Sequence, residues 1–387
     1  MKAFVNAKLV FPDRVEEGVI LEEKGKILAS GNVIPPEAAE IIDLGGAYVG
    51  PGLIDIHCHG FSGAGSKETY YVTADPENMA KAHLKGGTTS ITPSIPYCEP
   101  VDSFFSGIEK IKAAMAKEDS TILGIHFEGP FINPKYGANS QNAWAFSRET
   151  CDKIFDAAGD AVLHCTYAPE MPFGEEMEQI LAERGVIADI GHTEVDPVTA
   201  ARAVKNGARI VTHLFDAMGC WRGRESVAET GVLQESADAV VLAIPGLYYE
   251  LICDSRGIHV KPANAKMAFR IAGEDGIILV TDNAGEQNYD PADYPADHPR
   301  STPDLNYNDA GQLSGSCIIL SGACKSFMNF TGADVRTAFK CASTNPARAL
   351  RMDDKIGSIL PGRDANLLVV DEDFAVKAVY FRGEEVI

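Results

Sequence analysis

Short apolar runs alternate with helix-like segments through the middle of the chain. Strand-like runs of four to seven residues occupy positions 53–58, 88–94, 121–127, 161–167, 186–190, 209–212, 247–253 and 277–281. Helix-like segments lie between them at positions 76–85, 101–117, 147–157, 173–184, 197–206 and 262–272. This alternation predicts an α/β fold built on a parallel sheet. Eight strands that alternate with helices fit a TIM-like (β/α)8 barrel, which we expect over residues 51–355.

A doubly wound open sheet is the alternative arrangement for the same pattern. Such a sheet often carries a Gly-x-Gly-x-x-Gly turn between a strand and a helix, where it binds a dinucleotide. No such motif follows any of the predicted strands. The barrel is therefore the preferred prediction.

The two ends of the chain have a different texture from the middle. Brief alternating runs at residues 3–5, 9–11, 18–22, 26–29 and 41–44 are separated by turns, which indicates a small sheet or sandwich. Similar runs at 365–370 and 375–381 follow Gly357, Pro361 and Gly362. We predict a small discontinuous β-sandwich domain formed by residues 1–50 together with 356–387, with the barrel inserted between them.

Length and charge narrow the class of protein. The 387 residues accommodate a barrel of about 250 residues plus a smaller module. The formal net charge of -21 excludes a general affinity for nucleic acid or for anionic membranes, because both need a positive field. An anionic small substrate is still allowed, since one or two local arginines can outweigh distant charges that salt screens.

The cysteines and the amino-terminal residues indicate the compartment. The nine cysteines form no Cys-x-x-Cys pair and are scattered through apolar runs, which suits buried thiols in a reducing environment. Residues 1–10 lack the apolar core of a secretory signal, and no apolar run approaches the length of a membrane span. We therefore expect a cytoplasmic protein.

Metal-ligand residue types stand at the carboxyl ends of the predicted strands, where barrels carry their chemistry. His57 and His59 end the first strand, and both point to one face because side chains alternate along a strand. The other strand ends carry Glu128, His192, His213 and Asp282. Four of the nine histidines of the chain lie at these ends. Four imidazoles and two carboxylates around one barrel mouth predict a binuclear metal site.

Several motifs resemble those of the amidohydrolase superfamily, and within it the N-acetylglucosamine-6-phosphate deacetylases. The resemblance extends over nearly the whole chain. It is carried by Pro-Gly-Leu-Ile-Asp-Ile-His-Cys-His-Gly at 51–60, His-Phe-Glu-Gly-Pro-Phe at 126–131, Ala-Pro-Glu-Met at 168–171, Gly-His-Thr at 191–193, Thr-His-Leu-Phe-Asp-Ala-Met at 212–218, Gly-Arg-Glu at 223–225, Gly-Ile-His-Val at 257–260, Val-Thr-Asp at 280–282 and Asn-Pro-Ala-Arg-Ala at 345–349. Glu-Gly-Pro is the most specific of these, because this family bridges its metals with a glutamate where many relatives use a modified lysine.

The resemblance implies the roles of the metal ligands. Glu128, His192 and His213 would hold one divalent metal, and His57 and His59 would hold a second together with Glu128 and Asp282. Zinc is the first choice, although iron, manganese and cobalt suit the same ligands. Asp282 would be the catalytic residue, which takes a proton from a metal-bound water and returns it to the departing amine.

The same resemblance implies a substrate-binding set in which this chain departs from the family. Arg224 and His259 match residues that contact the sugar phosphate. Asp216, next to Ala217, replaces an amide that helps to hold the phosphate, and a carboxylate there would repel a phosphate dianion. Asn139 stands where the family has a histidine near the sugar. In an expanded turn, Arg256 either restores a positive contact or is solvated.

These observations predict a metal-dependent amidohydrolase that removes the acetyl group of an N-acetyl amino sugar, with N-acetylglucosamine-6-phosphate as the first choice of substrate. One alternative is a deacylase of another N-acyl amino sugar, such as N-acetylgalactosamine-6-phosphate, or of an N-acyl amino acid. A second alternative, from a different class, is a non-catalytic sugar-binding relative. The resemblance also implies a homodimer in which phosphate contacts cross between subunits.

Overall fold

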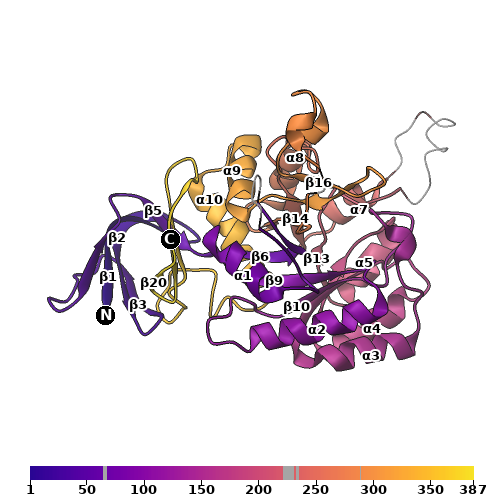
Figure 1. Cartoon of the computed structure of the whole chain (residues 1–387), viewed down its shortest axis with the longest axis horizontal. Helices are drawn as coiled ribbons and strands as arrows, with labels where there is room; N and C mark the ends of the chain where they lie inside the picture. The colour runs from indigo at the N-terminus through magenta and orange to yellow at the C-terminus, as the bar shows by residue number, and fades with distance from the viewer. Residues whose placement is uncertain (64–67, 221–230, 232–234, 288) are drawn as a thin grey trace.

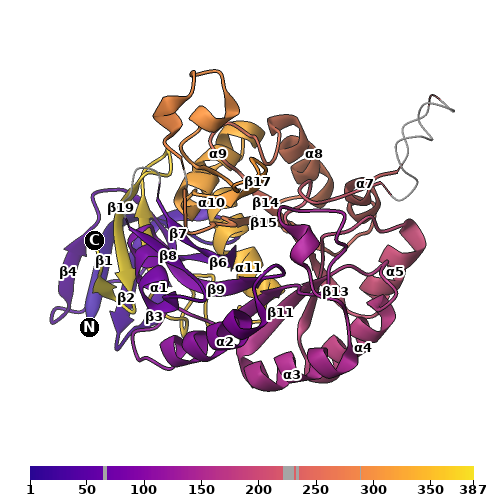
Figure 2. The ribbon, with the colours of Figure 1, turned by 45° about the vertical axis from the view of Figure 1, so that its right-hand side comes forward.

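The computed structural model describes residues 1–63, 68–220, 231, 235–287 and 289–387. It contains two large sheets, one at each end of the long axis of the molecule (Figure 1). Both chain termini lie in the smaller of the two parts, beside each other in the views of Figures 1 and 2.

The larger part is a barrel of eight strands, each parallel to its hydrogen-bonded neighbours. In sheet order the strands are β6 (Leu53–Cys58), β9 (Thr88–Pro96), β10 (Ile125–Glu128), β11 (Val162–Tyr167), β12 (Ile187–Ile190), β13 (Ala208–Val211), β14 (Tyr248–Ile252) and β15 (Ile277–Val280). The amide of Asp282 donates to the carbonyl of His57 at 2.8 Å, and the hydroxyl of Thr281 donates to Asp55 at 2.6 Å. These bonds link β15 back to β6, which confirms the predicted barrel.

Helices pack around the barrel, and capping residues mark where several of them begin. They are α1 (Pro76–Lys85), α2 (Val101–Met115), α3 (Arg148–Ala158), α4 (Gly174–Arg184), α5 (Pro197–Lys205), α7 (Ala237–Leu242), α8 (Pro262–Ala272), α9 (Leu320–Thr331), α10 (Val335–Phe339) and α11 (Asn345–Ala349). Asp75, Ser147 and Asp196 each accept a backbone N–H in the first turn of the helix that follows. The six predicted helices are confirmed, and the third strand begins later than predicted and includes Glu128.

The smaller part is a separate sheet built from both ends of the chain. It consists of β1 (Lys2–Val10), β2 (Val15–Glu23), β3 (Lys26–Gly31), β4 (Glu40–Asp43), β5 (Tyr48–Pro51), β18 (Leu367–Val370), β19 (Val376–Phe381) and β20 (Glu384–Glu385). The carboxyl-terminal strand β18 runs antiparallel to β5, with Val369 opposite Val49. A second domain made from both ends is therefore observed, and we propose residues 50 and 356 as its borders with the barrel.

Two small hairpins project at the same end of the barrel as the strand carboxyl ends. One pairs β7 (Gly60–Ser62) with β8 (Thr69–Tyr71), and the other pairs β16 (Leu305–Tyr307) with β17 (Leu313–Ser316). The second hairpin lies in the long segment that follows β15. Short 3-10 turns at Ser140–Asn142, Gly159–Ala161, Pro291–Asp293 and Pro299–Ser301 and a π-turn at Lys340–Thr344 complete the fold.

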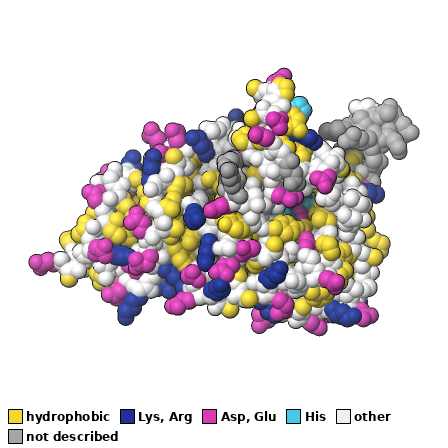
Figure 3. Space-filling model, in the orientation of Figure 1, with side chains coloured by type: hydrophobic (Ala, Val, Ile, Leu, Met, Phe, Trp, Pro, Cys, Tyr) yellow, Lys and Arg dark blue, Asp and Glu magenta, His cyan; other side chains and the backbone are white. Residues whose placement is uncertain are grey.

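On the face of the molecule that Figure 3 shows, the acidic side chains are not gathered into one region. Figure 3 shows acidic and basic side chains interspersed with apolar ones over the visible face. Among the described residues, no helix has both the length and the apolar character that a membrane crossing requires.

Candidate metal centre and active site

The six side chains predicted as metal ligands meet at the carboxyl ends of the barrel strands. His57 and His59 come from the end of β6 and Glu128 from the last position of β10. The other three are His192 after β12, His213 after β13 and Asp282 after β15, and each lies two residues beyond the end of its strand. All six residues are buried, with at most 8% of any of them exposed. His213 and Asp282 have positive φ angles of 28° and 47°. Such a backbone is strained for these residues and is common at functional sites.

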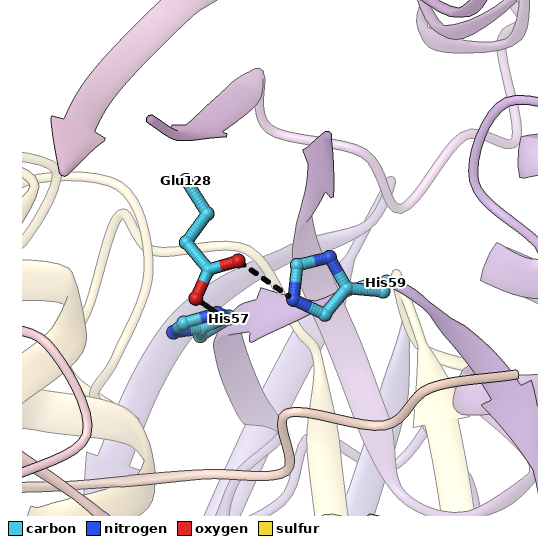
Figure 4. A group of neighbouring side chains, drawn as sticks. All are labelled: His57, His59 and Glu128. Carbon is cyan, nitrogen blue, oxygen red and sulfur yellow. Dashed lines mark ion pairs between the residues drawn. The ribbon is translucent and has the colours of Figure 1, made fainter. Parts of the chain in front are cut away.

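Glu128 lies between two groups of imidazoles. Its Oε1 is 3.0 Å from Nε2 of His192 and 3.2 Å from Nε2 of His213, and these two nitrogens are 3.0 Å apart. Oε2 of Glu128 lies 3.4 Å from Nε2 of His59, and Oε1 also lies 3.6 Å from Nε2 of His57 (Figure 4). Glu128 therefore belongs to two groups of potential metal ligands, one with His57 and His59 and the other with His192 and His213.

Asp282 completes the side of the centre that holds the first-strand histidines. Its Oδ1 is 3.1 Å from Nε2 of His59 and 3.7 Å from Nε2 of His57. The buried Nε2 of His57 has no hydrogen-bond partner, although carboxylate oxygens lie close to it. Ligand atoms bound to a tetrahedral cation at about 2 Å lie about 3.3 Å from one another, which is close to the distances found in this cluster. The donor set and its spacing fit divalent metal ions.

The electrostatics of the cluster also favour positive charge. Burial disfavours a charged His57, but the carboxylates of Glu250, Asp282 and Glu128 outweigh that cost and raise the pKa of His57 to about 10. Burial likewise acts against the Glu128 carboxylate, but hydrogen bonds from His192 and His213 hold its pKa well below the usual range. The site therefore stabilises a cation between its carboxylates.

A cavity of about 240 Å³ opens above this cluster. His59, Glu128 and Asp282 line its base, and Tyr97, Asn139, Asp216, Ala217, His259 and Glu286 are among the residues that line the rest. No lysine or arginine from the described part of the chain lines it. The cavity has the polar lining that a sugar needs, with more carboxylates than cations.

The predicted substrate-binding residues have three outcomes. Asn139, Asp216, Ala217 and His259 all line the cavity. Arg256 does not: its guanidinium donates to the carbonyl of His298 at 2.9 Å and to the hydroxyl of Ser301 at 3.1 Å, so it holds the segment at 296–302. The prediction for Arg224 lies outside the described residues.

Asp216 and His259 face each other inside the cavity. Nδ1 of His259 is 3.4 Å from Oδ1 of Asp216, and its Nε2 donates to the carbonyl of Gly315 at 3.1 Å. Burial disfavours a charged His259, but Asp216, with smaller contributions from Asp254 and Asp282, raises its pKa to about 9. The positive charge on His259, which the resemblance matched to a phosphate-contacting residue, is therefore balanced by the Asp216 carboxylate.

Sequence reasoning missed Tyr97, Glu250 and Glu286. Glu250 is fully buried on β14, with Oε2 3.0 Å from Nδ1 of His57. Its signal in the sequence was a single charged residue inside the apolar run at 247–253. Tyr97 packs its ring against that of His192, with centroids 4.8 Å apart, and its hydroxyl donates to the carbonyl of Ala138.

Comparisons with known proteins agree with this geometry. The model of the amidohydrolase family matches residues 48–386. The chain is 30% identical over 382 residues to the N-acetylglucosamine-6-phosphate deacetylase of Bacillus subtilis (strain 168), covering 95% of this chain and 92% of that one. It is 29% identical over 389 residues to the enzyme of that name from Bos taurus, covering 96% and 93% of the two chains.

Solved structures show the same fold. The crystal structure of N-acetylglucosamine-6-phosphate deacetylase from Pasteurella multocida matches with a TM-score of 0.83 at 26% identity, covering 99% of each chain. A Mycobacterium smegmatis deacetylase variant in complex with N-acetyl-D-glucosamine-6-phosphate matches with a TM-score of 0.81 at 23% identity, covering 100% of this chain and 99% of that one. With the metal-ligand cluster and the barrel, the chain therefore belongs to the amidohydrolase family, in the group of the N-acetylglucosamine-6-phosphate deacetylases.

Proposed function

We propose that this protein hydrolyses the acetamide of an N-acetyl amino sugar, with N-acetylglucosamine-6-phosphate as substrate and glucosamine-6-phosphate and acetate as products. The observation that carries this proposal is the convergence of His57, His59, Glu128, His192, His213 and Asp282 at the base of a polar cavity. The relatives at about 30% identity are named for this activity, and the match to them covers nearly their whole length.

The enzyme is a metal-dependent hydrolase, and we propose which residues hold the metal. Glu128, His192 and His213 would hold one ion, while His57 and His59, with Glu128 and Asp282, would hold a second. When bound, a divalent ion supplies a hydroxide near neutral pH and polarises the acyl oxygen. Zinc is our first choice, and iron, manganese or cobalt would suit the same ligands.

Asp282 carries the proton in this proposal. Its carboxylate is buried, it faces the cavity, and its Oδ1 contacts His59 at 3.1 Å. The amine of an amide must leave protonated, because an amide anion is too poor a leaving group. A carboxylate at this place can accept the proton of the attacking water and then donate it to the amine nitrogen.

Two alternatives remain for the substrate and the class of protein. The pairing of Asp216 with His259 keeps open an N-acyl amino sugar other than the proposed one, or an N-acyl amino acid. A sugar-binding relative without catalysis would not require the Asp282 carboxylate beside the metal ligands. We further propose a homodimer, from the family resemblance, and a cytoplasmic location, which the nine free cysteines support.

Acetate release tests the proposed activity. Protein loaded with zinc is offered N-acetylglucosamine, N-acetylgalactosamine and their 6-phosphates, and acetate is measured. The proposal expects the highest kcat/KM with N-acetylglucosamine-6-phosphate and loss of activity in His192→Ala and His213→Ala. Release from none of these sugars, or undiminished activity after metal removal, would contradict it.

A further inference from the structure

Glu250 contacts two of the candidate metal ligands from beneath the metal centre. It lies in the middle of β14 and is fully buried. Its Oε2 lies 3.0 Å from Nδ1 of His57 and accepts the backbone N–H of His213 at 3.1 Å. One carboxylate oxygen thus joins the ends of β6 and β13 to a third strand.

This contact decides which nitrogen of His57 is free to bind a metal. A carboxylate can only accept, so Nδ1 of His57 carries the hydrogen and donates it to Glu250. In a neutral imidazole, Nε2 then holds the lone pair. Nε2 lies 3.6 Å from Glu128 and 3.7 Å from Asp282, without a hydrogen-bond partner. Once a metal replaces the proton on Nε2, this lone pair would face the position between the carboxylates.

The imidazole rings of the other candidate ligands have contacts of their own that do not involve Glu250. His59 places Nδ1 2.8 Å from the carbonyl of Ser94, and His192 places Nδ1 3.2 Å from the carbonyl of Tyr136. His213 meets Glu250 only through its backbone. Of the four imidazoles, loss of the Glu250 carboxylate should therefore change the orientation of His57 most, and so weaken the cation position that uses His57 more than the position formed by His192 and His213.

We propose that Glu250 is a positioning residue, which presents Nε2 of His57 to a divalent cation held with His59 and Glu128 and so sets the occupancy of that position. This inference rests on the proposed metal centre. A hydrogen bond from a ligating histidine to a carboxylate fixes its tautomer and ring orientation, and removing such a partner typically weakens metal binding about 10–100-fold.

Asp189 offers a matched control. It is also fully buried in a barrel strand and also pairs with a histidine, with Oδ2 2.5 Å from Nδ1 of His164. Nε2 of His164 contacts the hydroxyl of Thr92, so this histidine is not among the proposed ligands. Asp189→Asn reports the effect of removing a buried carboxylate without disturbing the orientation of a ligand.

The test uses cobalt(II) as the probe on the full chain. Metal content after dialysis and affinity in competition with a chelator are measured for wild type, Glu250→Leu, Glu250→Gln, Asp189→Asn and His59→Ala. We expect two ions in wild type and one tightly held ion in both Glu250→Leu and His59→Ala. Asp189→Asn should keep both ions within about threefold of the wild-type affinity, because its histidine is not a ligand.

The conservative variant keeps the test decisive if Glu250→Leu does not fold. The amide oxygen of Glu250→Gln can still accept from Nδ1, but more weakly than a carboxylate. We therefore expect cobalt affinity to fall by about 3–10-fold, and only at the position held by His57, His59 and Glu128. Wild-type affinity in Glu250→Gln, or equal weakening in Asp189→Asn, would overturn the inference. The inference would also be overturned if wild type bound only one cobalt ion and His59→Ala still bound that ion. A wild-type chain that binds no cobalt would instead refute the proposed metal centre itself.

Discussion

Asp282 contacts the candidate metal ligands and faces the cavity, and we propose that it both binds metal and carries a proton. Replacing one of its carboxylate oxygens by an amide nitrogen separates these two roles. Asp282→Asn keeps an oxygen that can bind a cation but loses the ability to carry a proton. We expect the metal content to stay near that of wild type and kcat to fall by about 10²–10⁴-fold. Acetate release and metal analysis on the same sample measure both quantities. A kcat close to that of wild type would show that another group moves the proton.

Asp216 is the residue at which the cavity is least suited to a phosphate dianion. Its carboxylate balances the charge of His259, to which it lies 3.4 Å distant. In Asp216→Asn, a phosphate would meet His259 without that competing charge. We expect kcat/KM for N-acetylglucosamine-6-phosphate to rise by about tenfold, which corresponds to about 1.4 kcal/mol.

N-acetylglucosamine without phosphate is the matched control for this variant. Its kcat/KM should change by less than about threefold, since no dianion is present to be repelled. An equal gain with both sugars would mean that Asp216 acts on the shape of the cavity and not on its charge.

Gly137 shows how closely the loop after β10 approaches the metal centre. It has a φ of 94°, and a Cβ there would lie 2.4 Å from Nδ1 of His192. Gly246 has a similar φ of 88°, but a Cβ there would meet nothing within 4 Å. We expect both alanine variants to lose about 1–2 kcal/mol of unfolding free energy from backbone strain. Only Gly137→Ala should also displace His192 and so lower the affinity for cobalt. Competition with a chelator measures that affinity, and equal affinity in the two variants would contradict the prediction.

Individual helices depend on single buried contacts, and α1 gives a case with a pH signature. His83 of α1 donates from Nε2 to the carbonyl of Gly60 on β7 at 2.9 Å. Burial lowers the pKa of His83 to about 4. The unfolded chain, with a pKa near 6.5, then binds more protons than the folded chain between these two values. Folding stability from this residue is complete above pH 6.5 and is lost as the pH falls toward 4.

His83→Gln tests this contact, because the amide can still donate to Gly60 but cannot titrate. At pH 5 the wild-type histidine should cost about 2 kcal/mol of unfolding free energy relative to pH 8. Urea unfolding of both proteins at the two pH values measures the difference. The variant should lose less stability than wild type by that amount, and parallel losses would assign the pH dependence to other groups.

Strands with a continuous apolar pattern could be predicted from the sequence, whereas the role of a residue whose partners are distant in the sequence could not. The barrel strands were recognisable because residues such as 277–280 are continuously apolar between polar segments. The ligands were recognisable because parallel strands bring their carboxyl ends together. Glu250 escaped prediction because one charged residue in an apolar run does not reveal what it faces. Arg256 was a candidate for the substrate site because it lies in an expanded turn near His259, but its partners at 296–302 are set by tertiary structure.

At the scale of the whole molecule, strand β18 belongs to two cores at once. Leu368 and Val370 pack in the large core that includes the barrel strands and helices, while Leu367 and Val369 pack in the core of the small sheet with Phe4 and others. Alternate residues of a strand point to opposite faces, so β18 is shared between the two parts. We therefore expect the small sheet and the barrel to unfold together.

Leu367→Ala and Leu368→Ala form a matched pair for this prediction, because both residues are fully buried and they are adjacent on one strand. Each should lower the free energy of unfolding by about 2–5 kcal/mol. Hydrogen exchange of β1 reports on the small sheet, and that of β10 reports on the barrel. If the two cores unfold as one unit, each variant speeds exchange in both strands by a similar factor. If Leu367→Ala speeds exchange in β1 alone and leaves β10 protected as in wild type, the two parts unfold independently and the proposed border at residue 356 also separates their stabilities.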